Sequence, residues 1–468
     1  MLELSREAME SLGNLVVDHL VTHRADIRDQ PASRVLSRSA ADELLDEALP
    51  LNGTDPEALV NRLKKDVFAN ISHVDHPRFF AFVPGPGNFV AAMGAALAAG
   101  YNVFAGTWLG GSGAARLEQT VIDWLKEAVG YPPDGGGLFV SGGSMANLTA
   151  LGAARHAKLG SHDARGVVYF SDQTHSAVER ALRVLGLPES QMRRIPADPS
   201  RGLDPEQLSN QVRADRAAGL TPFCVVANAG TTNTGAVDPL RAIADICDRE
   251  DLWFHVDGAY GAAAVFGNRA TAALRGLSRA DSIALDPHKW LFQPFECGCL
   301  LVRDSIALRS AYAIHPDYMV DTRLEDEEIN FCEYGVQLSR SFRALSLWMT
   351  LKTFGANAVG KAIDHAFDMA DHAETVLSGM PGWVLVTPPS MAILTFRFED
   401  GPADSLDAWN AAMVRQLRES GVAMVSSTLL RGNYVIRLCP TNPRTTREDI
   451  EVTLGALAQS ARDAGYCR

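Results

Sequence analysis

Residues 282–290 read Ser282-Ile283-Ala284-Leu285-Asp286-Pro287-His288-Lys289-Trp290. The apolar run predicts a buried strand, and Lys289 follows it directly before Trp290, Leu291 and Phe292. A lysine between two apolar runs is partly desolvated, which favours the neutral, nucleophilic form of its amine. Such amines form Schiff bases with carbonyl compounds. From these residues alone, a lysine whose stem extends from a buried strand to water is an alternative of equal weight.

The composition indicates a globular chain of more than one domain. At 468 residues it exceeds one ordinary core, so we expect two domains and an appendage. No apolar run approaches the ~18–20 residues that a membrane span needs. The net charge of −13 argues against a nucleic-acid partner, because phosphates need a basic surface. We therefore expect a small-molecule partner, and neither a nucleic acid nor a membrane.

The seven cysteines are scattered and odd in number, which suits a reducing cytoplasm. The acidic, amphipathic residues 1–7 are not typical of a signal peptide. Cys297-Gly298-Cys299 has the spacing of a metal pair, but no second pair or ligand histidine accompanies it. We expect buried thiols in a strand, no metal, and a cytoplasmic location.

Residues 1–85 are predicted to be helical. Leu12, Leu15, Val16 and Leu20 lie at helical spacing, and Asp55-Pro56 is typical of a helix start. Ser39 with Asp42 resembles a capping box. The apolar faces are narrow, so we expect these helices to form a dimerisation arm that packs on a second subunit.

Residues 86–350 alternate short apolar runs with helical stretches. Runs that are continuously apolar are expected of strands covered on both faces. The pattern predicts a mostly parallel α/β sheet. The expected strands are 138–140, 167–170, 223–227, 253–256, 282–285 and 299–302.

Residues 351–468 are predicted to form a small α+β domain after a long helix at 343–354. Residues 391–396 and 434–438 are predicted strands. Thr445 with Glu448 is predicted to cap a last helix.

Polar residues follow most of the predicted strands, where open α/β sheets bind ligands. Small residues at Ser141-Gly142-Gly143-Ser144 would let backbone N–H groups approach a phosphate, although a tight turn looks similar. His175 follows the next strand, and a loop histidine is more often structural. Thr231 and then Asp257, with Ala259 beside it, follow the two strands after that.

Together these residues match the needs of pyridoxal 5′-phosphate. Its phosphate needs donors, and Lys289 would hold its aldehyde. Asp257 would keep the pyridine nitrogen protonated, so that the ring accepts electrons. Ala259 is small enough to lie flat under the ring.

The chain resembles the group II pyridoxal-phosphate-dependent amino-acid decarboxylases, and most closely the aromatic-L-amino-acid and tryptophan decarboxylases. The resemblance covers nearly the whole chain and rests on long motifs in a fixed order. They are 76–82 (HPRFFAF), 106–108 (GTW), 141–147 (SGGSMAN), 255–260 (HVDGAY), 286–290 (DPHKW) and 340–345 (RSFRAL).

The resemblance implies a fold and an assembly. The fold is type I of the pyridoxal-phosphate enzymes, with a mostly parallel seven-stranded sheet in a large domain, residues 86–350. A helical N-terminal arm, residues 1–85, and a small C-terminal α+β domain, residues 351–468, complete it. The assembly is a homodimer with active sites at the subunit interface.

The resemblance also implies residue roles. Lys289 matches the Schiff-base lysine, His288 and the Gly143–Ser144 loop match the phosphate site, and His175 matches the imidazole that stacks on the ring. Thr231 matches a hydroxyl near the ring oxygen. Tyr318 matches a tyrosine on a mobile loop that delivers a proton to the carbanion; the acidic run 325–328 follows it.

The substrate pocket implied by the resemblance comprises Phe82, Val83, Pro84, Gly85 and a Phe104 from the other subunit. Gly85 stands where animal dopa decarboxylases carry a threonine, which argues against a preference for dihydroxylated rings. Arg437 has two open interpretations: it binds a substrate carboxylate, or it makes a structural salt bridge.

These residues predict decarboxylation of a hydrophobic, aromatic L-amino acid to the amine and CO2. One alternative is a decarboxylation-dependent oxidative deaminase that yields an aldehyde; such relatives tend to lack the loop tyrosine or the stacking histidine. Others are a decarboxylase of aliphatic or acidic amino acids, and a catalytically silent binding protein.

Overall fold

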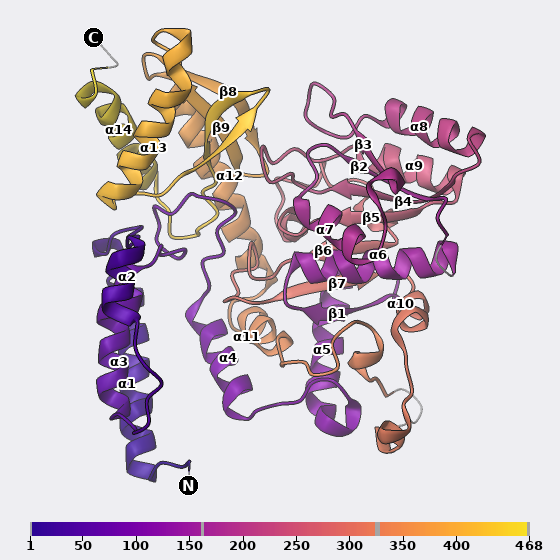
Figure 1. Cartoon of the computed structure of the whole chain (residues 1–468), viewed down its shortest axis with the longest axis horizontal. Coiled ribbons are helices and arrows are strands. Elements are labelled where there is room, and N and C mark those ends of the chain that lie inside the picture. The colour runs from indigo at the N-terminus through magenta and orange to yellow at the C-terminus, as the bar shows by residue number, and fades with distance from the viewer. Residues whose placement is uncertain (1, 161–162, 323–327, 466–468) are drawn as a thin grey trace. The chain divides into compact units, whose positions relative to one another are not determined.

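The structure, a computed structural model, describes residues 2–160, 163–322 and 328–465. The chain divides into two compact units (Figure 1). The first consists of the described residues of Met1–Pro84, His372–Val386 and Thr395–Arg468, and the second of those of Gly85–Asp371 and Thr387–Leu394.

A seven-stranded sheet forms the centre of the second unit, which confirms the predicted fold class (Figure 1). Its order is β1-β7-β6-β5-β4-β2-β3. The neighbours from β6 to β3 are parallel, and β7 runs antiparallel to both β1 and β6. The strands are β1 (Gly136–Val140), β2 (Gly166–Ser171), β3 (Met192–Ile195), β4 (Thr221–Asn228), β5 (Trp253–Asp257), β6 (Ser282–Leu285) and β7 (Gly298–Val302).

Helices cover both faces of this sheet, which explains why its strands are continuously apolar. α6 and α7 lie on one side and α8 and α9 on the other (Figure 1). Val168 and Phe170 of β2 belong to one buried cluster with Leu151 of α6 and Leu182 of α7. The helices of this unit are α4 (Phe89–Gly100), α5 (Trp108–Val129), α6 (Gly143–Leu159), α7 (Ser176–Val184), α8 (Pro205–Ala217), α9 (Leu240–Glu250), α10 (Ser305–Tyr312) and α11 (Ala344–Phe354); α12 (Ala356–Ser378) continues into the first unit.

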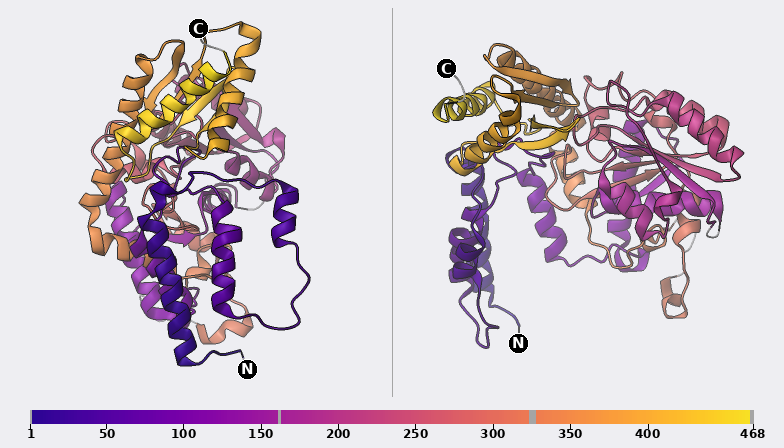
Figure 2. Two further views of the ribbon diagram at one scale, coloured as in Figure 1. Left: turned by 90° about the vertical axis from the view of Figure 1, so that its left-hand side faces the viewer. Right: turned by 45° about the horizontal axis from the view of Figure 1, so that its top comes forward.

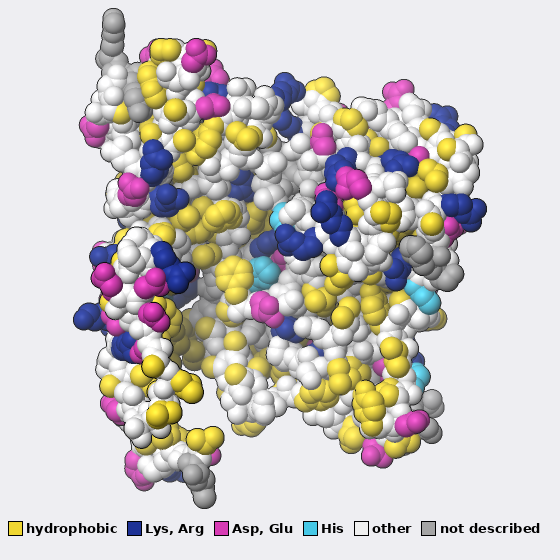
Figure 3. Space-filling model, viewed as in Figure 1, with side chains coloured by type: hydrophobic (Ala, Val, Ile, Leu, Met, Phe, Trp, Pro, Cys, Tyr) yellow, Lys and Arg dark blue, Asp and Glu magenta, His cyan; other side chains and the backbone are white. Residues whose placement is uncertain are grey.

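The first unit begins with α1 (Arg6–Ala25), α2 (Arg38–Leu45) and α3 (Pro56–Arg62). α1 and α3 run side by side (Figures 1 and 2). Within the chain as described, none of the residues of these three helices is buried. Apolar side chains gather along the lower half of the arm (Figure 3). Val17, Leu20 and Val21 of α1 are also exposed.

Two predicted helix caps are wrong, each by a short shift along the chain. The N-cap of α2 is Ser37, whose Oγ accepts the N–H of Ala40 at 3.2 Å. Asp42, expected to complete a box with Ser39, instead pairs with Arg38 at 2.7 Å. The predicted cap at Asp55 is confirmed.

The last helix, α14 (Arg447–Asp463), begins with a capping box of Thr446 and Asp449 instead of Thr445 and Glu448. The Thr445 hydroxyl is engaged elsewhere, because it donates to the carbonyl of Pro77 at 2.7 Å. α13 (Leu406–Ser420) also belongs to this region.

A second sheet has the order β10-β11-β9-β8. Its strands are β8 (Trp383–Ser390), β9 (Ile393–Phe398), β10 (Ser426–Leu430) and β11 (Asn433–Leu438), and β10 pairs antiparallel with β11. Across the described part of the chain, no helix combines the length and apolar character needed to cross a membrane.

Candidate active site

The carboxyl ends of four adjacent parallel strands lie at one edge of the large sheet. The order is β6, β5, β4, β2, and these strands are followed by Lys289, Asp257 with its neighbours, Thr231 and His175. β1 runs in the same direction, because it is antiparallel to β7, which is antiparallel to β6. α6 therefore begins at the same edge, the usual ligand site of open α/β sheets.

Lys289 forms an ion pair with a buried carboxylate. Its Nζ lies 3.0 Å from Oδ2 of Asp286, and the Lys289 side chain is 27% exposed whereas that of Asp286 is 3% exposed. Lys289 is thus half-buried beside a carboxylate and open to solvent on one side. Asp286 is not among the site residues predicted from the sequence.

His288 is held next to Lys289 by residues of the loop that precedes β7. Its Nδ1 lies 2.7 Å from the carbonyl of Cys297, and the centre of its ring lies 4.9 Å from that of the Phe295 ring, with the two planes tilted by 45°. Burial lowers the pKa of His288, with Asp286 opposing the shift, so the ring favours its neutral form.

The start of α6 packs closely on the loops after β5 and β6. A Cβ on Gly143 would lie 3.0 Å from Oδ2 of Asp286 and 3.1 Å from Cβ of Ala259. Among the described residues, no side chain hydrogen bond caps the first turn of α6, and Ser144 there is exposed. The amides of a 17-residue helix are therefore available to an anion.

Asp257, the last residue of β5, is 6% exposed. Oδ2 accepts a hydrogen bond from Nδ2 of Asn147 at 3.1 Å, and Oδ1 accepts one from the N–H of Ala259 at 3.2 Å. Among the described residues, no cationic side chain pairs with it. A buried carboxylate needs a compensating charge, so Asp257 suits a cationic ligand atom.

His175 and Thr231 complete the edge. His175 is exposed and is the N-cap of α7: its Nδ1 accepts the N–H of Ala177 at 3.2 Å, which leaves Nε2 as the donor of the ring. Thr231 is buried, with its Oγ1 3.1 Å from that of Thr234.

Two predicted pocket residues, Gly85 and Phe104, belong to the second unit. A Cβ on Gly85 would overlap the carbonyl oxygen of His288 and lie 2.9 Å from its carbonyl carbon, so the two backbones are in direct contact. Phe104 packs its ring on Gly106 and Gly110, where added Cβ atoms would lie 2.7 and 2.6 Å from ring carbons.

The first unit carries the other pocket residues. Phe82 has a φ of 56°, a conformation that non-glycine residues rarely adopt, and is 63% exposed. Its carbonyl accepts a hydrogen bond from Nη1 of the buried Arg437, and its N–H donates to Ser426 at 3.1 Å. Arg437 thus supports the backbone of Phe82. Val83 is half-buried, and Pro84 is buried and accepts a hydrogen bond from Thr441 at 2.9 Å.

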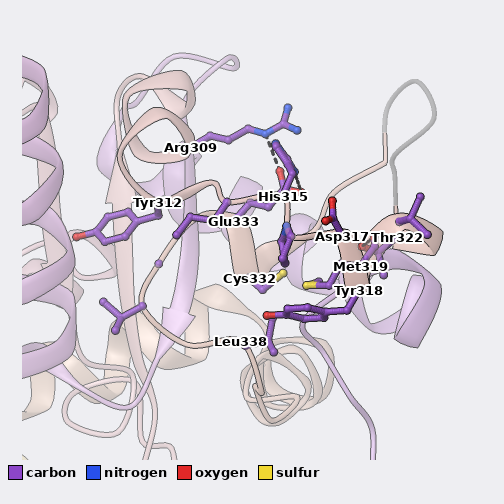
Figure 4. A pocket seen from close by; sticks show the side chains of 15 residues that line it. Arg309, Tyr312, His315, Asp317, Tyr318, Met319, Thr322, Cys332, Glu333 and Leu338 are labelled. Atoms are coloured by element: carbon purple, nitrogen blue, oxygen red, sulfur yellow. Dashed lines mark hydrogen bonds and ion pairs between the residues drawn. The ribbon is translucent and has the colours of Figure 1, made fainter.

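Tyr318 lies apart from the residues that surround Lys289. It is 81% exposed, on the short segment Asp317–Thr322, and lines a cavity of about 1000 Å³ bounded by residues between Arg309 and Leu338. Tyr318 and Tyr312 lie on opposite sides of this cavity (Figure 4). Of the acidic run 325–328, residues 325–327 lie outside the described part of the chain.

Three possible metal ligands, His23, His73 and Asp75, meet in the first unit. Nε2 of His23 lies 3.2 Å and Nη1 of Arg24 lies 3.3 Å from the same oxygen of Asp75. The hydrogen bond with Asp75 raises the pKa of His23, so these contacts describe an ion-pair cluster.

The residues at the sheet edge fit pyridoxal phosphate. An amine at Lys289 suits its aldehyde, uncapped amides at the start of α6 suit its phosphate, and the unpaired charge of Asp257 suits a protonated ring nitrogen.

Comparison with known proteins supports this fit. An aromatic-L-amino-acid decarboxylase from Bacillus atrophaeus is 46% identical over 473 residues, covering 100% of this chain and 98% of the relative. A phenylacetaldehyde synthase from Petunia hybrida is 28% identical over 98% of this chain and 95% of its own length. The crystal structure of Oryza sativa TDC with PLP and tryptamine superposes with a TM-score of 0.93 at 28% identity, over 99% of each chain.

Residues 39–399 match the family described as "Pyridoxal-dependent decarboxylase conserved domain". This match and the 46% identity to an aromatic-L-amino-acid decarboxylase confirm both the predicted family and the predicted cofactor: the chain belongs to the pyridoxal-dependent decarboxylases, carboxy-lyases that use pyridoxal 5′-phosphate.

Proposed function

We propose that this protein removes the carboxylate of an aromatic L-amino acid as CO2 and releases the amine. The observation that carries the substrate class is the 46% identity, over the whole chain, to an aromatic-L-amino-acid decarboxylase. The site residues and assembly described next are part of the proposal.

Each residue at the sheet edge has a separate task. Lys289 binds the aldehyde of the cofactor, and Asp286 beside it keeps a negative charge next to the amine. Asp257 pairs with the ring nitrogen, Ala259 leaves room for the ring, and His175 stacks on it. Thr231 lies near the ring oxygen, while Gly143, Ser144 and His288 hold the phosphate.

Pyridoxal phosphate, when bound, supplies a protonated ring that takes up the electron pair left by departing CO2. The burial of Asp257 strengthens its interaction with a cation, because charges attract one another more strongly away from water.

Tyr318 delivers the proton that completes the amine. Its 81% exposure and its place on a short segment mean that the segment must close over the substrate to bring the hydroxyl to the reacting carbon. A positioned phenol favours protonation over reaction of the carbanion with oxygen.

The substrate side chain is held by Phe82, Val83, Pro84, Gly85 and, from a second copy of the chain, Phe104. The supporting observation for a homodimer is the arm, residues 1–85, whose three described α-helices, α1, α2 and α3, contain no buried residue. The apolar side chains that they expose need a partner surface. The large domain, residues 86–350, and the small domain, 351–468, complete the subunit.

We further infer a cytoplasmic location. The described cysteines, Cys224, Cys247, Cys297, Cys299, Cys332 and Cys439, are all free, and all but Cys332 are buried. Unpaired thiols suit a reducing compartment.

A substrate panel tests the proposal. The holoenzyme is supplied with aromatic, aliphatic and acidic L-amino acids, and CO2, amine, aldehyde and peroxide are measured for each. We expect CO2 and amine in equal amounts from aromatic substrates. Aldehyde with peroxide as the main products would instead identify an oxidative deaminase.

The panel also includes the Lys289→Ala variant, which should release no CO2 from any substrate. Turnover only with aliphatic or acidic substrates would refute the aromatic assignment. A holoenzyme that binds the cofactor but turns over nothing would refute the catalytic role altogether.

A further inference from the structure

A chain of four buried hydrogen bonds ends on Asp257. Nε1 of Trp253 lies 2.9 Å from Oγ of Ser282, and Nδ1 of His255 lies 2.8 Å from the same oxygen. Nε2 of His255 lies 2.7 Å from Oδ1 of Asn147, whose Nδ2 lies 3.1 Å from Oδ2 of Asp257. All five side chains are buried, at 6% exposure or less.

The chemistry of the two ends fixes the direction of each bond. A carboxylate only accepts, so the amide nitrogen of Asn147 must donate to Asp257, and the amide oxygen then faces His255. That oxygen only accepts, so His255 must carry a proton on Nε2. Indole N–H only donates, so Ser282 accepts from Trp253 and uses its own proton toward Nδ1 of His255.

His255 must be neutral for this arrangement to hold. Burial lowers its pKa to about 4, and nearby Asp257 only partly opposes that shift. With Nε2 protonated and Nδ1 bare, every donor in the chain points toward Asp257. Aligned hydrogen bonds polarise one another, so the last N–H, from Asn147, is a stronger donor to the carboxylate than an isolated amide.

The Asp257 carboxylate, at the end of this series of hydrogen bonds, has few other groups that stabilise its charge. Within the part of the chain that the structure describes, its other hydrogen-bond donor is the backbone N–H of Ala259 at 3.2 Å. Hydrogen bonds to an ionised acceptor favour the ionised form, and two donors on different oxygens also fix the plane of the carboxylate.

We propose that Asn147, His255, Ser282 and Trp253 form a relay that positions Asp257 and keeps it ionised against the ring nitrogen of the cofactor. The proposal rests on the role proposed above for Asp257, and deepens it. The four residues are positioning residues, because they act on the cofactor only through Asp257. By stabilising the carboxylate, the relay extends the pH range over which the ring nitrogen keeps its proton.

The test measures the protonation of that nitrogen directly. The apoprotein is reconstituted with pyridoxal phosphate carrying ¹⁵N in its ring, and the ¹⁵N chemical shift is followed as the pH is raised. Asn147→Leu removes the last donor at nearly constant volume, so the ring nitrogen should lose its proton about one to two pH units below the wild type, the shift expected from one hydrogen bond to a charged group.

A graded series tests the relay as a whole. His255→Leu removes the donor to Asn147 and should shift the titration, whereas His255→Gln retains an N–H that reaches Asn147 and should restore most of it. Ser282→Ala breaks a hydrogen bond farther from Asp257 and should give a smaller shift in the same direction. Because it is the mildest change, it also provides a test of the relay if His255→Leu does not fold. Tyr169→Phe is the control, because it removes a buried hydrogen bond of 2.8 Å to Asp215 that is not part of the relay.

The outcomes separate this proposal from the function on which it rests. If Asp257→Asn shifts the ring nitrogen and Asn147→Leu, His255→Leu and Ser282→Ala do not, the relay is wrong and the role of Asp257 stands. If Asp257→Asn has no effect either, the proposed role of Asp257 is wrong. A shift of the same size in Tyr169→Phe would show a general packing effect and would also overturn the relay.

Discussion

Gly85→Ala tests how closely the backbone at Gly85 approaches the backbone of His288, the residue before Lys289. The added Cβ would overlap the carbonyl oxygen of His288 and lie 2.9 Å from its carbonyl carbon. Carbon atoms pack about 3.5–4.0 Å apart, so the two backbones must separate by at least about 0.6 Å. Overpacking of this kind costs about 1–3 kcal/mol of unfolding free energy.

The same displacement should also reach the chemistry. His288 directly precedes Lys289, and a misplacement of about 1 Å in a catalytic group can lower kcat about 100-fold. We therefore expect Gly85→Ala to lower both the unfolding free energy, measured by urea denaturation, and kcat, measured by CO2 release.

Gly455→Ala is the matched control. Gly455 lies in α14, and a Cβ there would meet no atom within 4 Å. In a helix interior this substitution should raise the unfolding free energy by up to about 1 kcal/mol. If Gly85→Ala matches the wild type within about 0.5 kcal/mol, the usual range of a neutral surface change, and keeps its kcat, the close approach to His288 is refuted.

Three further predictions concern the site. Lys289→Ala should release no CO2 while its circular dichroism stays native, and borohydride reduction of the wild type should link the cofactor to Lys289; a label on another lysine would refute the assignment. Tyr318→Phe removes the proton donor but keeps the ring, so product analysis should detect aldehyde and peroxide beside the amine; amine alone at an undiminished rate would show that the proton comes from another group. Burial lowers the pKa of His255 from 6.5 to about 4. Between these pH values the unfolded chain therefore binds a proton that the native protein does not bind. The stability that is present above pH 6.5 is consequently lost as the pH falls toward 4. The unfolding free energy of the wild type minus that of His255→Gln should therefore fall by about 3 kcal/mol between pH 7 and 4. Asp238, whose pKa burial raises to about 6, contributes in the opposite direction, but its contribution is common to both proteins and cancels in the difference. A difference that stays constant with pH would show that His255 is not buried in its neutral form.

The predicted strands that the structure confirms are mostly apolar, although β5 contains His255 and β11 contains Arg437. The predicted strand 391–396 corresponds to β9, which begins two residues later, at Ile393. The strand at 282–285 has the predicted bounds, since both of its faces are covered. β3 was missed because its centre is Arg193-Arg194, which an edge strand tolerates. β8 was missed because it contains Pro388 and Pro389, and β10 because it begins Ser426-Ser427-Thr428.

The site could be predicted only as a set of local motifs. Each polar residue that follows a strand could be identified in the sequence. These residues could be grouped into one site, because the strand ends of a parallel sheet meet at one edge. The contacts between motifs were not visible: Asn147 and Asp257 are 110 positions apart, and the approach of Gly85 to His288 involves backbone atoms. No residue pattern in a single sequence marks such contacts.

Two regular periodicities nevertheless explain why those contacts form. Side chains alternate along a strand, so His255 and Asp257 of β5 point to the same face of the sheet, the face on which α6 lies. Residues four apart share one side of a helix, so Gly143 and Asn147 of α6 both face the sheet. Gly143 then packs on Ala259 while Asn147 reaches His255 and Asp257. The loop predicted to hold the phosphate and the donor to the Asp257 carboxylate therefore both belong to one helix, and a shift of α6 along the sheet would displace both.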